Sequence, residues 1–267
     1  MKNLLNADTL GAIISYNIKY DNKSDVTNNW NLRKKKLVKL LETSSPSFIG
    51  IQEGLLHQVK YIDTNLPNYN YIGVGRDDGG KKGEFCAIYY ESKKYKLLKQ
   101  STFWLSKTPE KVSIGWDAAL ERVCTYGYFE DRVSNARLWV FNTHFDHIGQ
   151  QSRLESSRLI LEKIKKLNSF NEPTILMGDF NALPKSDAIQ LILKKLDDTM
   201  VSSSQKHEGP IGTFNGFDTK ESIDKRIDYV FTKKLDISSH KHLDIRLQSG
   251  YHVSDHLPVL IKGVLSP

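Results

Sequence analysis

The chain has 267 residues, which is long enough for one α/β or all-β domain with a large buried core. Hydrophobic residues make up 39% of it and aromatic residues 10%, and the mean hydropathy is −0.45. This composition excludes intrinsic disorder, collagen and a coiled-coil rod. The 38 basic and 31 acidic residues give a formal net charge of +7, which either favours anionic partners or serves solubility alone.

Short strands with a few helices between them are the expected elements. Strands are predicted where β-branched or aromatic runs are bounded by Gly, Asn, Asp or Pro, and helices where apolar residues recur with a period of about 3.6. In chain order they are strand 12–17, helix 30–42, strands 48–52, 71–74, 85–90, 123–129 and 138–143, helix 150–168, strand 174–178, helix 186–196, and strands 227–231 and 257–261. Because strands and helices do not alternate strictly, we expect mixed sheets packed on each other with helices outside, in one domain over residues 1–267.

Other features bear on surface and compartment. Basic runs, interpreted as solvated outer faces with a nucleic-acid track as the alternative, lie at 33–36, 93–96 and 163–166. Cys86 and Cys124 each lie in an apolar run and are expected to be buried thiols. No stretch approaches the roughly 20 apolar residues of a membrane span, and the N-terminus lacks the apolar segment of a secretory signal. We therefore expect a monomer without integral membrane association, cytoplasmic unless a signal has been trimmed.

Polar residues of catalytic type recur at the ends of the predicted strands. They are Asn17, Glu53, His144 with Asp146, Asp179 with Asn181, Asp228, and Asp255 with His256. Taken singly, each has a structural explanation, because Asp and Asn are common turn formers and a histidine can be half buried with its hydrogen bonds satisfied. Taken together they indicate a functional site, because loops at strand ends are where a rigid sheet presents reactive groups.

The same residues supply the parts of a metal-dependent phosphoryl site. Glu53 is a suitable carboxylate for Mg²⁺ or Mn²⁺, with Asn17 and Asp255 as oxygen neighbours. An ion bound to a phosphate oxygen acts there as a Lewis acid. An attacking water needs an acceptor for its proton, for which Asp179 is suited, and a donor that positions it, for which Asn181 is suited.

Two histidines complete this set. His256, tuned by the carboxylate of Asp228, is expected to contact the phosphate or to move a proton. His144 offers a second cationic or hydrogen-bonding contact from the other side of the site.

Five motifs occur in an order that resembles the endonuclease/exonuclease/phosphatase superfamily. They are Y-N-I at 16–18, Q-E at 52–53, T-H at 143–144, G-D-F-N at 178–181 and S-D-H at 254–256. The superfamily includes DNase I-like nucleases, apurinic endonucleases, sphingomyelinases, inositol polyphosphate phosphatases and deadenylases. The resemblance implies a four-layer α/β sandwich, with two mixed sheets face to face and helices outside, and hydrolysis at phosphorus with a divalent metal.

The resemblance also implies roles for individual residues. Glu53 matches the principal metal ligand, Asn17 the first-motif asparagine and Asp255 the metal-proximal aspartate. Asp179 and Asn181 match one catalytic pair of the family, and Asp228 and His256 match the other. His144 matches the second active-site histidine. Glu84, in K-G-E-F, occupies a place where some nucleases of the family pair a glutamate with that histidine. Lys19 replaces the aspartate of apurinic endonucleases, which removes a possible ligand for a second metal.

Divergent segments at 115–119, 144–149 and 212–218 resemble a bacterial branch loosely grouped with deadenylase-like proteins. The candidate substrate-binding residues, most of them in or beside these segments, are Arg122, Trp116, Asp117, Asp146, Asn215 and Phe217, with Phe214 and His147 beside them. Arg122 is either a phosphate clamp or part of a surface salt bridge. The aromatic side chains either stack on a base or a sugar ring or only pin their loops.

These features favour a divalent-metal-dependent phosphodiesterase or phosphatase that acts on a small phosphoester or one linked to a sugar or inositol. Acidic groups around the rim would repel a long polyanion, whereas the basic pI favours the alternative, a nuclease acting on DNA or RNA as an endonuclease or as a 3′-exonuclease of deadenylase type. A non-catalytic binding module is a remote alternative, because the motifs are intact. A phospholipid-surface enzyme would need an exposed apolar hairpin, for which 114–116 is a faint candidate.

Overall fold

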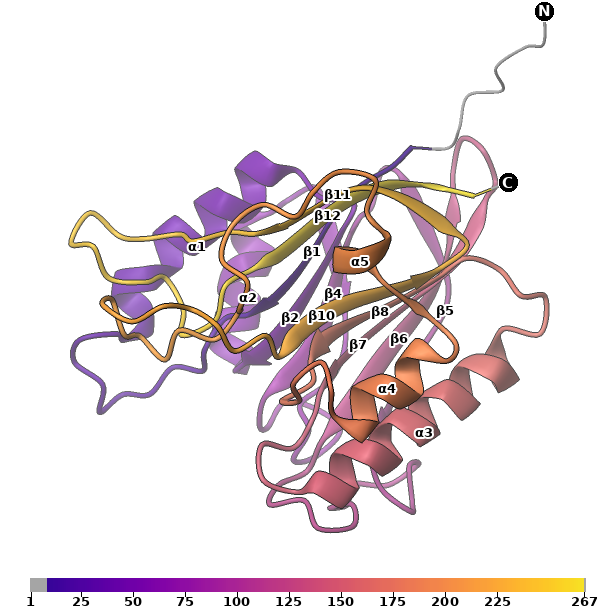
Figure 1. Cartoon of the computed structure of the whole chain (residues 1–267), viewed down its shortest axis with the longest axis horizontal. Helices are drawn as coiled ribbons and strands as arrows, with labels where there is room; N and C mark the ends of the chain where they lie inside the picture. The colour runs from indigo at the N-terminus through magenta and orange to yellow at the C-terminus, as the bar shows by residue number, and fades with distance from the viewer. Residues whose placement is uncertain (1–8, 267) are drawn as a thin grey trace, which may run out of the picture.

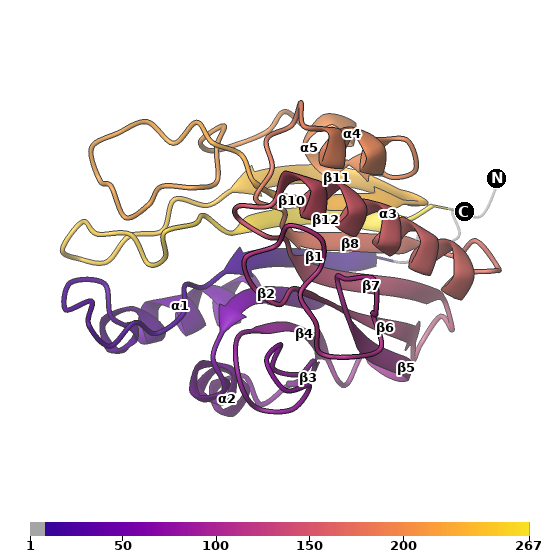
Figure 2. The same cartoon turned by 90° about the horizontal axis from the view of Figure 1, so that it is seen from below.

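The computed structural model describes residues 9–266, which form two six-stranded mixed sheets packed face to face with helices on their outer faces (Figures 1 and 2). This arrangement confirms the four-layer sandwich expected from the sequence. The N-terminal segment, which was predicted to lack a secretory signal, falls mostly on residues 1–8. These residues lie outside the described part of the chain.

Strand order in each sheet departs from chain order. Sheet A consists of β1 (Thr9–Asn17), β2 (Phe48–Gly54), β3 (Tyr69–Ile72), β4 (Phe85–Glu91), β11 (Leu235–His242) and β12 (Val259–Leu265), in the order β11-β12-β1-β2-β4-β3. Sheet B consists of β5 (Tyr95–Trp104), β6 (Val123–Asp131), β7 (Arg137–His144), β8 (Thr174–Asp179), β9 (Asp197–Asp198) and β10 (Asp228–Lys233), in the order β5-β6-β7-β8-β10-β9. The helices are α1 (Trp30–Ser44), α2 (Leu56–Asn65), α3 (Gln150–Leu167), α4 (Asp187–Leu193) and α5 (Thr199–Ser202).

Three apolar layers hold the sandwich together. Between the sheets, Ile13 and Phe48 of sheet A share a buried cluster with Val140, Ile175 and Met177 of sheet B. Two further clusters join α1 and α2 to the outer face of sheet A, and α3 and α4 to that of sheet B (Figure 2). Removal of this apolar surface from water is the main force that stabilises the fold.

All nine predicted strands and all three predicted helices correspond to elements of the structure, with ends displaced by a few residues. The elements not predicted are β5, β9, β11, α2 and α5. Strand β5 lacks the apolar signal because the middle of the strand is largely exposed and carries Lys96 and Lys99. Cys86 and Cys124 are buried free thiols, as predicted. Among the helices of residues 9–266, none is long and apolar enough to cross a membrane.

The interpretation of 33–36 as a solvated basic face was wrong at its first residue. Arg33 is only 1% exposed, and its guanidinium donates to the backbone carbonyls of Ile18 (2.7 Å), Val253 (2.9 Å) and Lys19 (3.0 Å). These carbonyls belong to the segments that follow β1 and precede β12. Arg33 therefore ties together the two chain segments that carry the first and last motifs.

Parallel strands at the centre of each sheet bring the motif residues to one edge. In sheet A, β1 and β2 are parallel with Asn17 opposite Gln52. In sheet B, β7 and β8 are parallel with His144 opposite Asp179. Strand β10 runs antiparallel to β8 and places Asp228 opposite Asp179. The register of these pairs, not the order of residues in the chain, determines which side chains meet.

Asn142 of β7 joins the two sheets directly beneath this edge. Its amide nitrogen donates to the backbone carbonyls of Ile51 (2.8 Å) and Ala87 (2.9 Å), both in sheet A. Its amide oxygen accepts a hydrogen bond of 2.7 Å from the side chain of Gln52. All of these groups are buried. The polar bridge therefore sets the relative position of the strand ends that carry Glu53 and His144.

Candidate active site

The strand-end residues meet in one cleft of about 450 Å³. Its described lining comprises Lys19, Tyr20, Glu53, Arg76, Glu84, Leu120, Arg122, His144, His147, Asp179, Asn181, Phe214, Asp255 and His256. Both sheets contribute, so the cleft spans the open end of the sandwich. A volume of this size suits a small organic ligand.

Asn17 is the central connection in the floor of the cleft. Its amide nitrogen donates to Glu53 Oε1 (3.0 Å) and to Asp179 Oδ2 (2.9 Å), which links a carboxylate of sheet A to one of sheet B. Its amide oxygen accepts the backbone N–H of Lys19 (3.1 Å). The ligand role expected for Asn17 stays a prediction, because in this arrangement its oxygen accepts a backbone N–H and its nitrogen faces the carboxylates. Asn17 orients the acidic groups.

Glu53 and Asp255 share a cation. The ammonium of Lys19 lies 3.0 Å from Asp255 Oδ2 and 3.6 Å from Glu53 Oε2. Burial opposes ionisation of Glu53, but Lys19, His256 and the amide of Asn17 outweigh it and lower the pKa of that carboxyl below its usual value. Glu53 has a φ of +61°, an uncommon conformation for a non-glycine residue, at the bulge that ends β2.

The position directly before Asp179 accepts only glycine. Gly178 has a φ of +152°, and a Cβ added there would lie 2.1 Å from the carbonyl oxygen of Thr143. The backbone N–H of Asn181 donates to Asp179 Oδ1 (2.9 Å). Burial and the neighbouring Asp228 raise the pKa of Asp179 to about 7, although His256 opposes them. A carboxyl with a pKa near neutrality can accept a proton during turnover.

His256 and Asp228 form the predicted carboxylate–histidine pair. His256 Nδ1 lies 2.8 Å from Asp228 Oδ2, and its Nε2 lies 3.7 Å from Asp179 Oδ2. Burial alone would lower the pKa of His256, but Asp228 and Asp179 raise it to about 10. The imidazole is therefore cationic at neutral pH. The ring of Phe214 packs against it edge-on, with ring centroids 5.1 Å apart.

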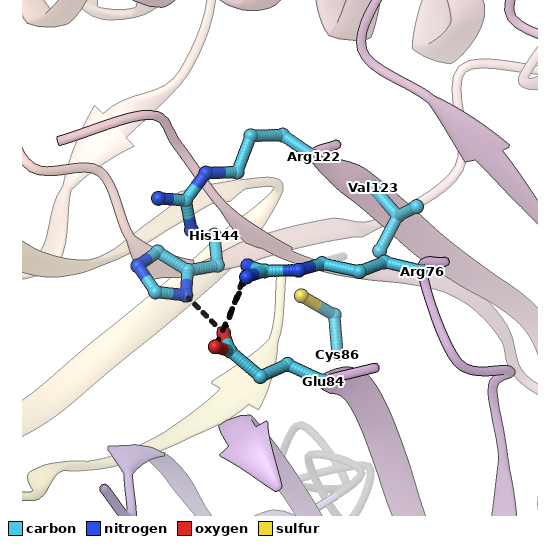
Figure 3. Close-up of a pocket in the computed structure, with 6 residues that line it drawn as sticks. All are labelled: Arg76, Glu84, Cys86, Arg122, Val123 and His144. Atoms are coloured by element: carbon cyan, nitrogen blue, oxygen red, sulfur yellow. Dashed lines mark hydrogen bonds and ion pairs between the residues drawn. The ribbon is translucent and has the colours of Figure 1, made fainter. Parts of the chain in front are cut away.

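His144 stands between two guanidinium groups on the opposite wall (Figure 3). Burial, Arg122 and Arg76 hold the pKa of His144 well below its usual value, so the ring is neutral. The amide of Asn181 donates to its Nε2 (3.1 Å), which leaves Nδ1–H facing Glu84 Oε2 at 3.8 Å. Glu84 and His144 are therefore neighbours in the structure, as the predicted pairing requires.

Arg76 and Arg122 are the basic residues of this wall. Arg76 holds Glu84 with two contacts, of 2.8 and 3.0 Å, and burial raises the pKa of Glu84 to about 7 despite Arg76. Arg122 is 4% exposed and contacts Asp146 (3.3 Å) and His147 (3.0 Å), so it is not part of a surface salt bridge. Its Nη1 is buried without a hydrogen-bond partner among the described residues.

Several candidate substrate-binding residues brace the loops instead of lining the cleft. Asp117 accepts the backbone N–H groups of Gln151 and Ser152 at the start of α3, and Asp146 accepts those of Ile148 and Gly149 as well as Arg122. The side chain of Asn215 bonds to the backbone of Ser254 and Phe217. Trp116, Asp117, Asp146, Asn215 and Phe217 are absent from the described lining of the cleft. The acidic rim expected from the sequence is therefore not present as such.

Sequence reasoning missed three lining residues, namely Arg76, Tyr20 and Leu120. Arg76 had a weak signal, because it lies in a Gly-rich loop just before K-G-E-F. Its buried pairing with Glu84 was not visible from the sequence.

The carboxylates at the floor fit a hard divalent cation. An oxygen of Glu53, an oxygen of Asp179 and a ring nitrogen of His256 lie within 4.8 Å of one another, and of these groups the two carboxylates can act as ligands while the imidazole is cationic. Carboxylate oxygens are the ligands that Mg²⁺ and Mn²⁺ prefer, and the Asp255 carboxylate adjoins the set through Lys19. The ammonium of Lys19 neutralises two of these carboxylates in the metal-free protein.

Comparisons with known proteins agree with this geometry. The model of the Endonuclease/Exonuclease/phosphatase family matches residues 14–256. A solved structure of a mannosyl-6-phosphatase from Bacteroides thetaiotaomicron is 35% identical, with a TM-score of 0.90 over 96% of this chain and all of that chain. The uncharacterized protein L388 of Acanthamoeba polyphaga mimivirus is 29% identical over 87% of this chain and 91% of its own length.

A more distant match indicates the wider group. Carbon catabolite repressor protein 4 homolog 5 of Arabidopsis thaliana is 26% identical over 67% of this chain, and the match spans 41% of that protein. The resemblance to a bacterial branch grouped loosely with deadenylase-like proteins is therefore confirmed. Taken with the family match over most of its length, the convergent motif residues and the two-sheet sandwich, the chain belongs to the Endonuclease/Exonuclease/phosphatase family of phosphoester hydrolases.

Proposed function

We propose that this protein is a divalent-metal-dependent phosphoesterase that hydrolyses a compact sugar phosphate, with a terminal phosphate monoester as the scissile group. The observation that carries the proposal is the convergence of Glu53, Asp179 and His256 within 4.8 Å, opposite a wall with two buried guanidinium groups. Carboxylates for a cation and guanidinium groups for an anion, on facing walls, are the two requirements of phosphate hydrolysis.

Each residue of the floor has a step that its geometry allows. With Mg²⁺ or Mn²⁺ bound at Glu53 and Asp255, a phosphate oxygen would be polarised and its charge offset. Asp179 accepts the proton of the attacking water, which Asn181 helps to position. His256, kept cationic by Asp228, donates a hydrogen bond to the phosphate or a proton to the leaving oxygen. Asn17 orients Glu53 and Asp179 and does not touch the substrate.

On the opposite wall, Arg122 lines the cleft, where a guanidinium group can hold phosphate oxygens. Arg76 is held by Glu84, and the two together place His144 beside the site. The guanidinium groups of Arg76 and Arg122 favour a phosphate with two negative charges, which a monoester carries and a diester does not.

Two further observations support a small substrate. The mannosyl-6-phosphatase is 35% identical and covers this chain almost completely, whereas the deadenylase-like relative is 26% identical over a smaller share. The volume of about 450 Å³ suits a hexose phosphate better than several nucleotides. The side chains of Tyr20 and Phe214 line the same cleft and offer apolar surface to a sugar ring.

The nuclease alternative retains one argument, which is the net charge of +7. The acidic rim that spoke against a polyanion is absent, because Asp117 and Asp146 are turned toward backbone N–H groups. Charge therefore does not distinguish a sugar phosphate from a nucleic acid as the substrate. Measurements of activity are needed to distinguish them.

The decisive experiment compares initial rates on mannose 6-phosphate, other hexose phosphates, inositol phosphates, bis-p-nitrophenyl phosphate, oligo(A) and plasmid DNA, each with Mg²⁺ or Mn²⁺. The matched control is Asp179→Asn, which keeps the size of the side chain and removes the proton acceptor, so that its rate should fall about 10²–10⁴-fold. The proposal expects the highest kcat/KM on a hexose phosphate, and EDTA should abolish it.

Faster release of nucleotides from oligo(A) or DNA than of phosphate from any sugar ester would overturn the assignment in favour of the nuclease. Activity that survives in Asp179→Asn would instead remove Asp179 from its role.

A further inference from the structure

A second group of potential ligands lies outside the catalytic cleft. His207, His240 and His242 each present a ring nitrogen, and these three atoms lie within 4.8 Å of one another. The described lining of the cleft includes none of them. His240 and His242 alternate on β11, which directs both rings to one side of the strand, and His207 comes from the loop before Gly209.

The three rings pack closely and are largely removed from water. Ring centroids lie 5.0 Å apart for His207 and His240, 4.5 Å for His207 and His242, and 5.0 Å for His240 and His242. His240 is 1% exposed and His242 is 2% exposed, and His207 is half buried. Two of the three rings are therefore closed to bulk water, and the third borders it.

One backbone carbonyl orients two of the rings. The oxygen of Pro210 accepts a hydrogen bond from His207 Nε2 (3.0 Å) and another from His242 Nδ1 (2.8 Å). A carbonyl can only accept, so those nitrogens carry the protons, and the lone pairs lie on His207 Nδ1 and His242 Nε2. Histidines that bind metals donate their other ring N–H to a carbonyl or carboxylate in this way.

The arrangement is incomplete without a further partner. His242 Nε2 is buried and has no hydrogen-bond partner among the described residues. A buried acceptor left without a donor or a metal destabilises the fold. His240 Nδ1 lies 2.9 Å from His207 Nδ1 and donates to its lone pair, so a cation held by both nitrogens would require the proton of His240 to move to its Nε2.

From this geometry we propose that His207, His240 and His242 form a second, structural metal site for Zn²⁺ or a similar borderline divalent transition-metal ion. Three imidazole nitrogens select such ions over Mg²⁺, which prefers oxygen ligands. Tetrahedral coordination at about 2.0–2.1 Å would separate the ligand nitrogens by about 3.3 Å, which is within the 4.8 Å that spans the three atoms.

Charge near the cluster does not exclude a cation. Arg226 is the nearby charged residue that lowers the pKa of His240 and His242. It is paired with Asp198 through contacts of 3.2 and 2.6 Å, so that most of its charge is neutralised. The repulsion between Arg226 and a bound dication is therefore limited.

The site would fix a loop that reaches the catalytic cleft. Glu208 is joined to β11 by two backbone hydrogen bonds, to His240 and His242. A few residues later, the hydroxyl of Thr213 accepts the backbone N–H of Asp228, and Phe214 packs against the catalytic histidine. A metal that links the start of this loop to β11 would restrict its motion.

The test measures metal binding by the full chain after removal of metals with a chelator. Zn²⁺ is titrated by calorimetry, and Co²⁺ by the visible absorption of tetrahedral Co²⁺, both with Mg²⁺ in large excess to occupy the oxygen ligands of the catalytic floor. The variants are His207→Ala, whose half-exposed loop position tolerates truncation, and Glu53→Gln in the catalytic cleft. The control is His57→Ala, at an exposed histidine outside both sites.

The expected result is one equivalent of bound Zn²⁺, with tetrahedral Co²⁺ absorption, in the wild type, in Glu53→Gln and in His57→Ala. His207→Ala should bind Zn²⁺ at least about 10–100-fold more weakly, because loss of an outer partner alone costs that much. Circular dichroism confirms that this variant is folded, and hydrogen exchange over 203–214 should slow on Zn²⁺ binding only where His207 is present. No binding by the wild type under Mg²⁺ excess, or equal affinity in His207→Ala, would overturn the proposal.

Discussion

Replacement of Asn142 by Leu tests whether the polar bridge between the sheets sets the geometry of the site. Leucine has the same number and branching of side-chain heavy atoms as asparagine, so the change removes hydrogen bonds without opening a cavity. The buried carbonyls of Ile51 and Ala87 each lose a donor, and the amide of Gln52 loses its 2.7 Å acceptor.

The magnitude follows from these three groups. Each buried polar group left without its partner costs about 1–3 kcal/mol, so the loss of three such partners should lower the free energy of unfolding by about 3–9 kcal/mol. For a chain of this size each kcal/mol shifts Tm by about 2–4 °C, which predicts a loss of at least about 6 °C. A second change, Gln52→Leu, should recover part of this loss, because the unsatisfied amide is then removed as well.

Urea unfolding followed by circular dichroism measures these values, with Asn70→Leu on the exposed face of β3 as the matched control. The control should change stability by less than about 0.5 kcal/mol. A loss of under 1 kcal/mol in Asn142→Leu, or a double variant less stable than the sum of its parts, would refute the reasoning.

Three shorter predictions concern the cleft and its walls. Lys19→Met should tighten Mg²⁺ binding roughly tenfold or more in a calorimetric titration. The change removes a cation that holds two carboxylates in ion pairs worth about 1 kcal/mol each. Unchanged affinity for Mg²⁺ would contradict competition by Lys19. Gly178→Ala should destabilise the protein by more than about 2 kcal/mol in urea unfolding, because its Cβ would meet the carbonyl of Thr143. Although burial opposes ionisation of Asp146, backbone N–H donors lower the pKa of its carboxyl, so its contribution to stability is present above about pH 3.9 and is lost as the pH falls through the folded pKa. The stability advantage of the wild type over Asp146→Asn should therefore be constant from about pH 7 to about pH 5 and shrink below about pH 3.9.

The sequence predicted the floor of the cleft because its residues follow apolar strands that are easy to recognise. Once β1 and β2, and β7 and β8, pair in parallel, their carboxyl ends meet and bring Asn17, Glu53, His144 and Asp179 together. The position of each strand end can therefore be recognised from the residues next to it in the sequence. The same reasoning explains why β5, with its exposed lysines, was not predicted.

Roles that depend on contacts between distant loops could not be read in this way. Asp117 and Asp146 have the composition of a binding rim, but they stabilise the start of α3 and its preceding turn. Arg33 belongs to a basic run and yet is buried against three carbonyls. In each case a long-range hydrogen bond determines the orientation of a side chain, and sequence spacing carries no record of it.

The balance of charge in the cleft leads to one more expectation. Four cationic side chains, Lys19, Arg76, Arg122 and His256, face or pair with the carboxylates of Glu53, Asp255, Asp146 and Asp228, whereas Glu84 and Asp179, each with a pKa of about 7, are only partly ionised. Before a metal binds, the cleft is therefore close to neutral and attracts a phosphate dianion only weakly, whereas a dication makes it positive. Removal of the metal should then weaken substrate binding as well as turnover. Equilibrium binding of a non-hydrolysable hexose phosphonate, with and without Mg²⁺, measures this directly, and equal affinity in the two conditions would show that the arginines bind the phosphate without the metal.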